Sequence, residues 1–358
     1  MRSGAASSPV AVRDARTPVI VVSGFLGAGK TTLLKRVLQT PALSHSLLVV
    51  NEIGEIGIDH HLLERSDDRT LLLDNGCLCC QLRGDLQELL VDIAMRRKRG
   101  ELPGFDRVIV ETSGLADPGP VAQTLYSDAP LLRDYRLGHV VTLVDPTNAA
   151  GRAAAPAIAT RQVAAADRVV FSKSDRASPE QRAAAHDWVR SINAYADCED
   201  AAHGAIDAEA LAGATPFGWR MPDTGAGSDG EGAYLGRHLA PHPSDVASFA
   251  LTFDDPLPRA LFQEFIDLLV RLRGADLLRV KGIVRFDDSP VPVVVQGVCH
   301  VFDRHVPLAH GASAPARSTL VVIGRNLART DVLALWQALI ALSLSDTSTT
   351  PSPTGVLS

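Results

Sequence analysis

The chain has 358 residues, of which 46% are hydrophobic and 21% charged, and its formal net charge is −6. This composition is typical of a globular protein of about two domains. No run of five or six basic residues and no apolar run of about 18 residues occurs, so neither nucleic acid nor a membrane is an expected partner. Residues 1–16 lack the apolar core of a secretory signal, which predicts a disordered N-terminal arm and a cytoplasmic protein.

Residues 17–199 alternate between apolar runs and helical patterns. The predicted strands are Val19–Val22, Leu47–Val50, Arg107–Val110, His139–Val144 and Arg168–Phe171, and predicted helices include Thr31–Gln39 and Asp85–Arg99. Continuous apolar strands separated by helices indicate an α/β domain whose parallel sheet is covered by helices on both faces.

The composition changes near residue 200. Residues 200–244 are rich in Ala, Gly, Asp and Pro, which predicts a linker or mobile loop. In residues 245–344 we expect strands at Asp245–Phe253, Leu277–Phe286, Val291–Phe302 and Ser318–Ile323, and helices at Pro258–Arg273 and Thr330–Leu342. This grouping indicates a smaller α+β domain, and residues 345–358 are expected to form a disordered tail.

A phosphate-binding loop follows the first predicted strand. Residues 24–31 read GFLGAGKT, which matches G-x-x-x-x-G-K-[ST] between a strand and a helix. Glycines allow close approach of the backbone to phosphate, and the helix N-terminus directs N–H groups at it. Lys30 is predicted to bridge the β- and γ-phosphates, and the Thr31 hydroxyl to ligate Mg²⁺. The predicted nucleotide-binding residues here are Gly24, Gly27, Ala28, Gly29, Lys30, Thr31 and Thr32.

Two acids compete for the role of the carboxylate that supports this Mg²⁺. Glu111 ends the apolar run of RVIVETSG, and Gly114 stands three residues later, where a glycine that senses the γ-phosphate is expected. Asp145 follows a later strand and is the rival.

A third site is predicted at SKSD, residues 172–175, where Asp175 can accept from guanine and the stem of Lys173 can cover the base. Ser172 stands where an Asn is usual in the guanine motif.

Cysteines form a cluster after the second predicted strand. Three of the five, Cys77, Cys79 and Cys80, form a C-x-C-C motif, which indicates a zinc site. Cobalt can occupy similar ligands, and small buried hydrophobes or a redox sensor remain alternatives. In VNEIGEIGID, residues 50–59, Glu52 or Glu55 can orient water, bind Mg²⁺ or complete the thiolate site.

Together these motifs resemble a known family. GFLGAGKTTLL, VNEIGEIGID, NGCLCCQLRGDL and ETSGLADPGPVAQTL, in this order, are similar to the CobW-like P-loop GTPases, and RVKGI, VQGVCHVFD and LVVIGRNL resemble that family's C-terminal domain. The resemblance implies hydrolysis of GTP to GDP and phosphate, metal binding by the C-x-C-C motif and delivery of the metal to a client protein. Lys30, Glu52 and Glu111 are then the expected catalytic residues, and Thr31, Glu111 and the three cysteines the metal ligands.

The leading hypothesis is therefore a GTP-driven metallochaperone, with zinc as the expected metal. The alternative is a metal-responsive interaction or regulatory module whose shape is stabilised by nucleotide and which delivers no metal. A small-molecule kinase is a third hypothesis, weakened by the lack of an acceptor-binding motif. The sequence names neither the client nor the oligomeric state, and a homo-oligomer stays open.

Overall fold

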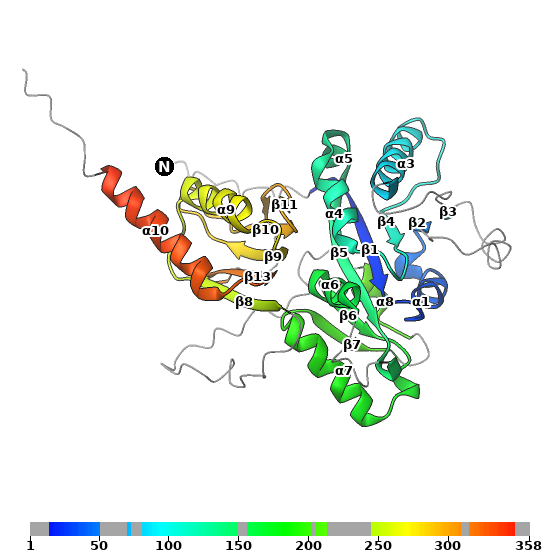
Figure 1. The fold of residues 1–358 in the computed structure, drawn as a ribbon. Helices are drawn as coiled ribbons and strands as arrows, with labels where there is room; N and C mark the ends of the chain where they lie inside the picture. Colours follow the sequence, from blue (N-terminus) through cyan, green and yellow to red (C-terminus); the bar gives the residue numbers. More distant parts are fainter. Residues whose placement is uncertain are drawn as a thin grey trace, which may run out of the picture.

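The computed structural model describes residues 14–50, 70–72, 81–148, 156–201, 205–212, 245–308 and 315–347. Figure 1 shows two domains, the first built on a parallel sheet and the second on an antiparallel one. The predicted fold, a P-loop parallel sheet followed by a smaller α+β domain, is confirmed. Among the described residues, no helix is long and apolar enough to cross a membrane.

The first domain has a seven-stranded sheet with the order β3-β2-β4-β1-β5-β6-β7, and each neighbouring pair is parallel. Its strands are β1 (Thr17–Gly24), β2 (Ser46–Val50), β3 (Thr70–Leu72), β4 (Arg107–Glu111), β5 (Tyr135–Val144), β6 (Arg168–Phe171) and β7 (Asp197–Asp200). Strand β7 lies outside the predicted set, because its residues are polar and partly exposed and carry no apolar run.

Helices cover both faces of this sheet. One face carries α1 (Lys30–Val37), the 3-10 turn η1 (Pro41–Leu43) and α8 (Ala208–Ala212). The other face carries α3 (Gln81–Lys98), α4 (Pro118–Ser127), α5 (Ala129–Asp134), α6 (Ala157–Ala165) and α7 (Pro179–Ile192). Alternate residues of β1 serve the two cores, Val19 and Val21 on one side and Ile20 and Val22 on the other. Burial on both sides explains why the strands read as continuous apolar runs.

The first domain continues past its predicted limit at residue 199. Ala201 and Leu211 are fully buried in the core shared with α1 and β2. Residues 200–201 and 205–212 therefore contribute structure where the composition indicates a linker. Their signal is weak because α8 has only five residues, three of which are alanines.

The second domain is a six-stranded antiparallel sheet with two helices on one face. Its elements are β8 (Val246–Phe253), α9 (Arg259–Arg273), β9 (Leu277–Val284), β10 (Val293–Val298), β11 (Val301–Phe302), β12 (Val306–Pro307), β13 (Ser318–Arg325) and α10 (Arg329–Thr347), with the order β11-β10-β9-β13-β8 and β12 beside β10. The single strand predicted at Val291–Phe302 is wrong, because Cys299, with φ 54°, turns the chain between β10 and β11. Helix α10 ends at Thr347, five residues beyond the predicted helix end at Leu342 and three beyond the predicted domain limit at 344.

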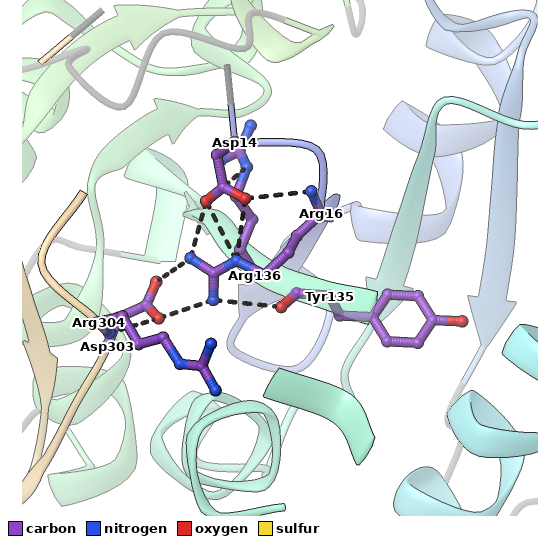
Figure 2. A network of polar contacts seen from close by, with 6 residues as sticks. All are labelled: Asp14, Arg16, Tyr135, Arg136, Asp303 and Arg304. Atoms are coloured by element: carbon purple, nitrogen blue, oxygen red, sulfur yellow. Dashed lines mark hydrogen bonds and ion pairs between the residues drawn. The ribbon is translucent and has the colours of Figure 1, made fainter. Parts of the chain in front are cut away.

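The sheet face opposite α9 and α10 meets the first domain through buried charges. Asp167, directly before β6, accepts hydrogen bonds from Arg279 at 2.6 Å and from Lys281 at 2.9 Å. All three side chains are at most 4% exposed. A second link starts in the predicted disordered arm, where Arg16 lies between Asp14 and Asp303 of the second domain, 2.9 Å from the latter (Figure 2). The last residues of that arm are thus ordered by ion pairs.

Candidate functional site

The phosphate loop joins β1 to α1 at the carboxyl edge of the parallel sheet. Gly27 and Gly29 have φ of 72° and 88°, in the left-handed region that favours glycine. Gly29 is the N-cap of α1 and has no side chain to cover the first N–H groups of the helix. Lys30 donates from Nζ to the Gly24 carbonyl at 2.8 Å, which holds the ammonium group over the loop. The loop thus has the shape and charge of an anion cradle.

Around this cradle the described residues of the loop differ in exposure. Ala28 is buried at 2% and packs into the core, so its backbone and not its side chain can face a phosphate. Thr32 is exposed on the first turn of α1, one residue after Thr31.

Glu111 is the acid that lies beside the phosphate loop. The Thr31 hydroxyl donates to Glu111 Oε1 at 2.6 Å, although the two residues are 80 positions apart in sequence. Glu111 is 3% exposed at the end of β4, next to Val22 of β1. A hydroxyl and a carboxylate held together supply the hard oxygen donors that Mg²⁺ prefers. The residues present therefore fit the predicted magnesium ion.

Asp145, the rival acid, is bound by Lys173 and Thr147. It accepts from Lys173 Nζ at 2.7 Å and from the Thr147 hydroxyl at 2.6 Å. Burial raises the pKa of Asp145, but hydrogen bonds from Lys173 and Thr147 outweigh it and keep the pKa below its usual value. Its carboxylate thus orients Lys173.

The predicted base-reading segment lies beside the phosphate loop. Lys173, in a left-handed conformation with φ 53°, also donates to the Gly27 carbonyl at 2.8 Å, so its stem spans from one loop to the other. Asp175 lies exposed in the next turn, η4 (Ser174–Arg176). Ser172 is 8% exposed, and its backbone N–H donates to Val144 at 2.9 Å.

In this segment an interaction that the sequence does not reveal fixes the loop. The Ser174 hydroxyl lies 2.7 Å from the Phe171 carbonyl oxygen and 3.0 Å from Asp200 Oδ1, and its single O–H is shared between these two acceptors. A serine hydroxyl thus braces this loop from inside, where the sequence motif lacks the usual Asn.

Gly114 packs directly against the phosphate loop. A Cβ built on Gly114 would lie 2.7 Å from the Leu26 backbone nitrogen and 2.8 Å from its Cα, closer than real contacts allow. The segment after β4 is held from behind by Gln162 of α6, which donates to the carbonyls of Gly114 and Ala116. Gln162 is not among the predicted site residues, because it stands beside Thr160 and Arg161 in α6 and belongs to no motif.

The remaining predicted site residues, Glu52, Glu55, Cys77, Cys79 and Cys80, lie outside the described residues. Within the ranges that the structure describes, no group of three or more His, Cys, Asp or Glu side chains could hold a metal ion. The predicted zinc site thus rests on the C-x-C-C motif in the sequence.

Comparisons with known proteins match both domains. Residues 18–199 match the family model described as "CobW/HypB/UreG, nucleotide-binding domain", and residues 246–340 match "Cobalamin synthesis protein cobW C-terminal domain". The chain is 31% identical to the zinc chaperone YjiA of Escherichia coli over 90% of its own length and 98% of that protein. It is 27% identical to zinc-regulated GTPase metalloprotein activator 1 of Schizosaccharomyces pombe, over 87% of its own length and 83% of that protein.

A solved structure is similar over the same extent. The crystal structure of the Zn(II)-bound YjiA GTPase from Escherichia coli superposes with a TM-score of 0.65 at 28% identity. The match covers 90% of this chain and 99% of that one.

Proposed function

This chain belongs to the CobW family of P-loop GTPases, and we propose that it binds zinc through Cys77, Cys79 and Cys80 and delivers it to a client metalloprotein in the cytosol. The observation that carries the nucleotide part of the proposal is the contact of Thr31 with Glu111 beside the phosphate loop, and the metal part rests on the C-x-C-C motif in the sequence. It assembles, from two distant segments, the groups that a nucleoside triphosphate with its metal requires.

In this proposal each residue of the loop has a defined task. Lys30 binds the β- and γ-phosphates, and the α1 N-terminus adds N–H donors. Thr31 and Glu111 hold a magnesium ion, which neutralises charge on the phosphates when bound. Gly114 lets the segment after β4 approach the γ-phosphate side of the loop, where a side chain would collide with Leu26. Glu52 is proposed to orient the attacking water.

Guanine is the proposed base. Lys173 joins the base-reading segment to the phosphate loop through the Gly27 carbonyl, so a base seated there lies on the same side as the phosphates. Asp175 can accept from guanine N1–H and the exocyclic amine, whereas adenine offers an acceptor at N1. The ion pair with Asp145 keeps Lys173 in place.

The positions of the strand ends support a link between nucleotide and metal. Val50 at the end of β2 pairs with both Glu111 and Leu72, the last residue of β3. Glu52 follows Val50 by two residues, so their Cα atoms lie at most roughly 7 Å apart. Cys77 follows Leu72 by five residues, so their Cα atoms lie at most roughly 18 Å apart. Cys80 directly precedes Gln81, the first residue of α3. The two strands that precede Glu52 and the cysteines in sequence thus end at the sheet edge where Glu111 lies.

Zinc is proposed as the metal on two grounds. Thiolate is a ligand that zinc prefers, and three thiolates leave one position for exchange with a client. Two relatives that match most of this chain carry zinc in their names. Co²⁺ remains the second candidate, because availability often decides between similar metals.

The test is GTP hydrolysis by the purified chain with and without zinc, beside Lys30→Ala. We expect the wild type to release phosphate and the variant to release none, because Lys30 supplies the charge on the β- and γ-phosphates. Near-normal turnover by Lys30→Ala would contradict the assignment. A pull-down with the chain bound to a nonhydrolysable GTP analogue should capture the client. Transfer of zinc to that client would then distinguish a metal-delivering chaperone from a purely regulatory module.

A further inference from the structure

A buried glutamine of α6 uses its amide to hold the segment that follows β4. Gln162 is 1% exposed. Its Nε2 donates to the Gly114 carbonyl at 3.2 Å and to the Ala116 carbonyl at 3.0 Å. An amide nitrogen carries two N–H groups, so both donors of Gln162 are directed to this one loop.

The loop that Gln162 holds is pressed against the phosphate loop. Gly114 leaves no room for a Cβ beside the Leu26 backbone, so a small displacement of Gly114 alters the surface that the phosphate loop presents. A weaker link joins the same two elements, since Arg161 Nε lies 3.5 Å from Asp117 Oδ2. Helix α6 therefore sets where residues 114–117 lie.

Helix α6 is itself firmly anchored. The Gln162 carbonyl accepts from the Thr142 hydroxyl of β5 at 2.9 Å. Asn193 caps the other end, donating to the Val163 and Ala166 carbonyls at 3.0 and 2.9 Å. Asp167, next along the chain, binds the second domain through two buried cations. The helix thus supplies a fixed reference against which the loop can be held.

We propose that Gln162 is a positioning residue that holds the Gly114–Ala116 loop in the geometry that favours a γ-phosphate, and so sets the discrimination between GTP and GDP. This inference rests on the proposed GTPase function and deepens it. GDP has no γ-phosphate to meet Gly114, so a displaced loop weakens GTP binding and leaves GDP binding unchanged. Asp167, two residues beyond the end of α6, binds the second domain, so the helix that carries Gln162 lies between that domain and the loop.

The experiment measures the affinities of GDP and a nonhydrolysable GTP analogue for the full chain and three variants. Gln162→Met keeps the length and apolar stem but has no donor, and Gln162→Glu places acceptors opposite the two carbonyls. The matched control is Val163→Ala. It shortens a neighbouring buried apolar side chain of α6 and leaves both Gln162 hydrogen bonds in place. Unchanged GDP affinity shows that each variant is folded.

For Gln162→Met we expect the analogue to bind roughly tenfold more weakly, the scale of two neutral hydrogen bonds partly replaced by new contacts. Gln162→Glu should lose more at pH 8 and regain part of the affinity at pH 6, because a buried carboxyl that takes up a proton recovers one donor. Val163→Ala should keep the wild-type ratio of the two affinities.

Two results would overturn the inference alone: wild-type discrimination in Gln162→Met, or an equal loss in Val163→Ala. Failure of the wild-type chain to bind either nucleotide would instead overturn the proposed function, and this inference with it.

Discussion

Removing the carboxylate of Asp167 should loosen the junction of the two domains. Asp167 accepts from Arg279 and Lys281, and one of its oxygens also accepts the Val140 backbone N–H at 2.9 Å. The cation side chains are only 2% and 1% exposed. In Asp167→Ala both would stay buried without their counter-charge. Breaking such a pair costs about 3–5 kcal/mol.

The effect of pH follows from the same contacts. Burial raises the pKa of Asp167, but Arg279 and Lys281 outweigh it and leave the pKa well below its usual range. The stability that Asp167 contributes is thus present above its unfolded pKa of about 4 and is lost in strong acid. Burial lowers the pKa of Lys281 from 10.5 to about 8, despite Asp167.

The assay is urea denaturation followed by tryptophan fluorescence, since Trp188 lies in α7 and Trp336 in α10. We expect Asp167→Ala to lower the unfolding free energy of the domain pair by about 3–5 kcal/mol. The double variant Asp167→Asn with Lys281→Met should be more stable than Asp167→Asn alone, because one uncompensated cation is gone. A loss under 1 kcal/mol in Asp167→Ala would refute the view that this triad joins the domains.

Three further changes test the nucleotide site by titration calorimetry. Gly114→Ala should weaken a GTP analogue at least tenfold and GDP far less, because the added Cβ meets the Leu26 backbone; equal losses would contradict this. Lys173→Met should weaken both nucleotides about tenfold, since the bonds to Gly27 and Asp145 are lost; an unchanged affinity would show that the link is dispensable. Asp175→Asn should reduce the preference for GTP over ATP by roughly 5–100-fold, and a wild type that binds both equally would exclude guanine recognition by Asp175.

Local sequence predicts those parts of the fold whose environment is uniform. Strand β1 is buried on both faces, so it reads as an apolar run, and the phosphate loop follows from its glycines and Lys30. Strand β7 has the polar sequence DCED and receives its register from β6 alone. The turn at Cys299 has no glycine or proline at its centre, so the chain reverses where the pattern predicts a continuous strand.

The candidate site shows the same division. Sequence alone predicts Lys30 and Thr31 as site residues, because they stand at fixed offsets in one motif. It leaves Glu111 and Asp145 as rivals, since both follow apolar strands, and the 2.6 Å contact with Thr31 favours Glu111. Gln162 and Asp167 act across distances of 46 and 112 residues, for which a local pattern carries no information.

If nucleotide and metal binding are coupled as proposed, the zinc affinity of the chain depends on which nucleotide is bound. A competitive titration with a chromophoric chelator at fixed pH, since thiols lose protons on binding, gives the dissociation constant in the apo, GDP and GTP-analogue states. We predict that the GDP and analogue states differ by about 5–150-fold, and that Cys79→Ser and Cys80→Ser weaken zinc binding and abolish this difference while nucleotide still binds. The same zinc affinity in all three states would show that the nucleotide does not control metal binding.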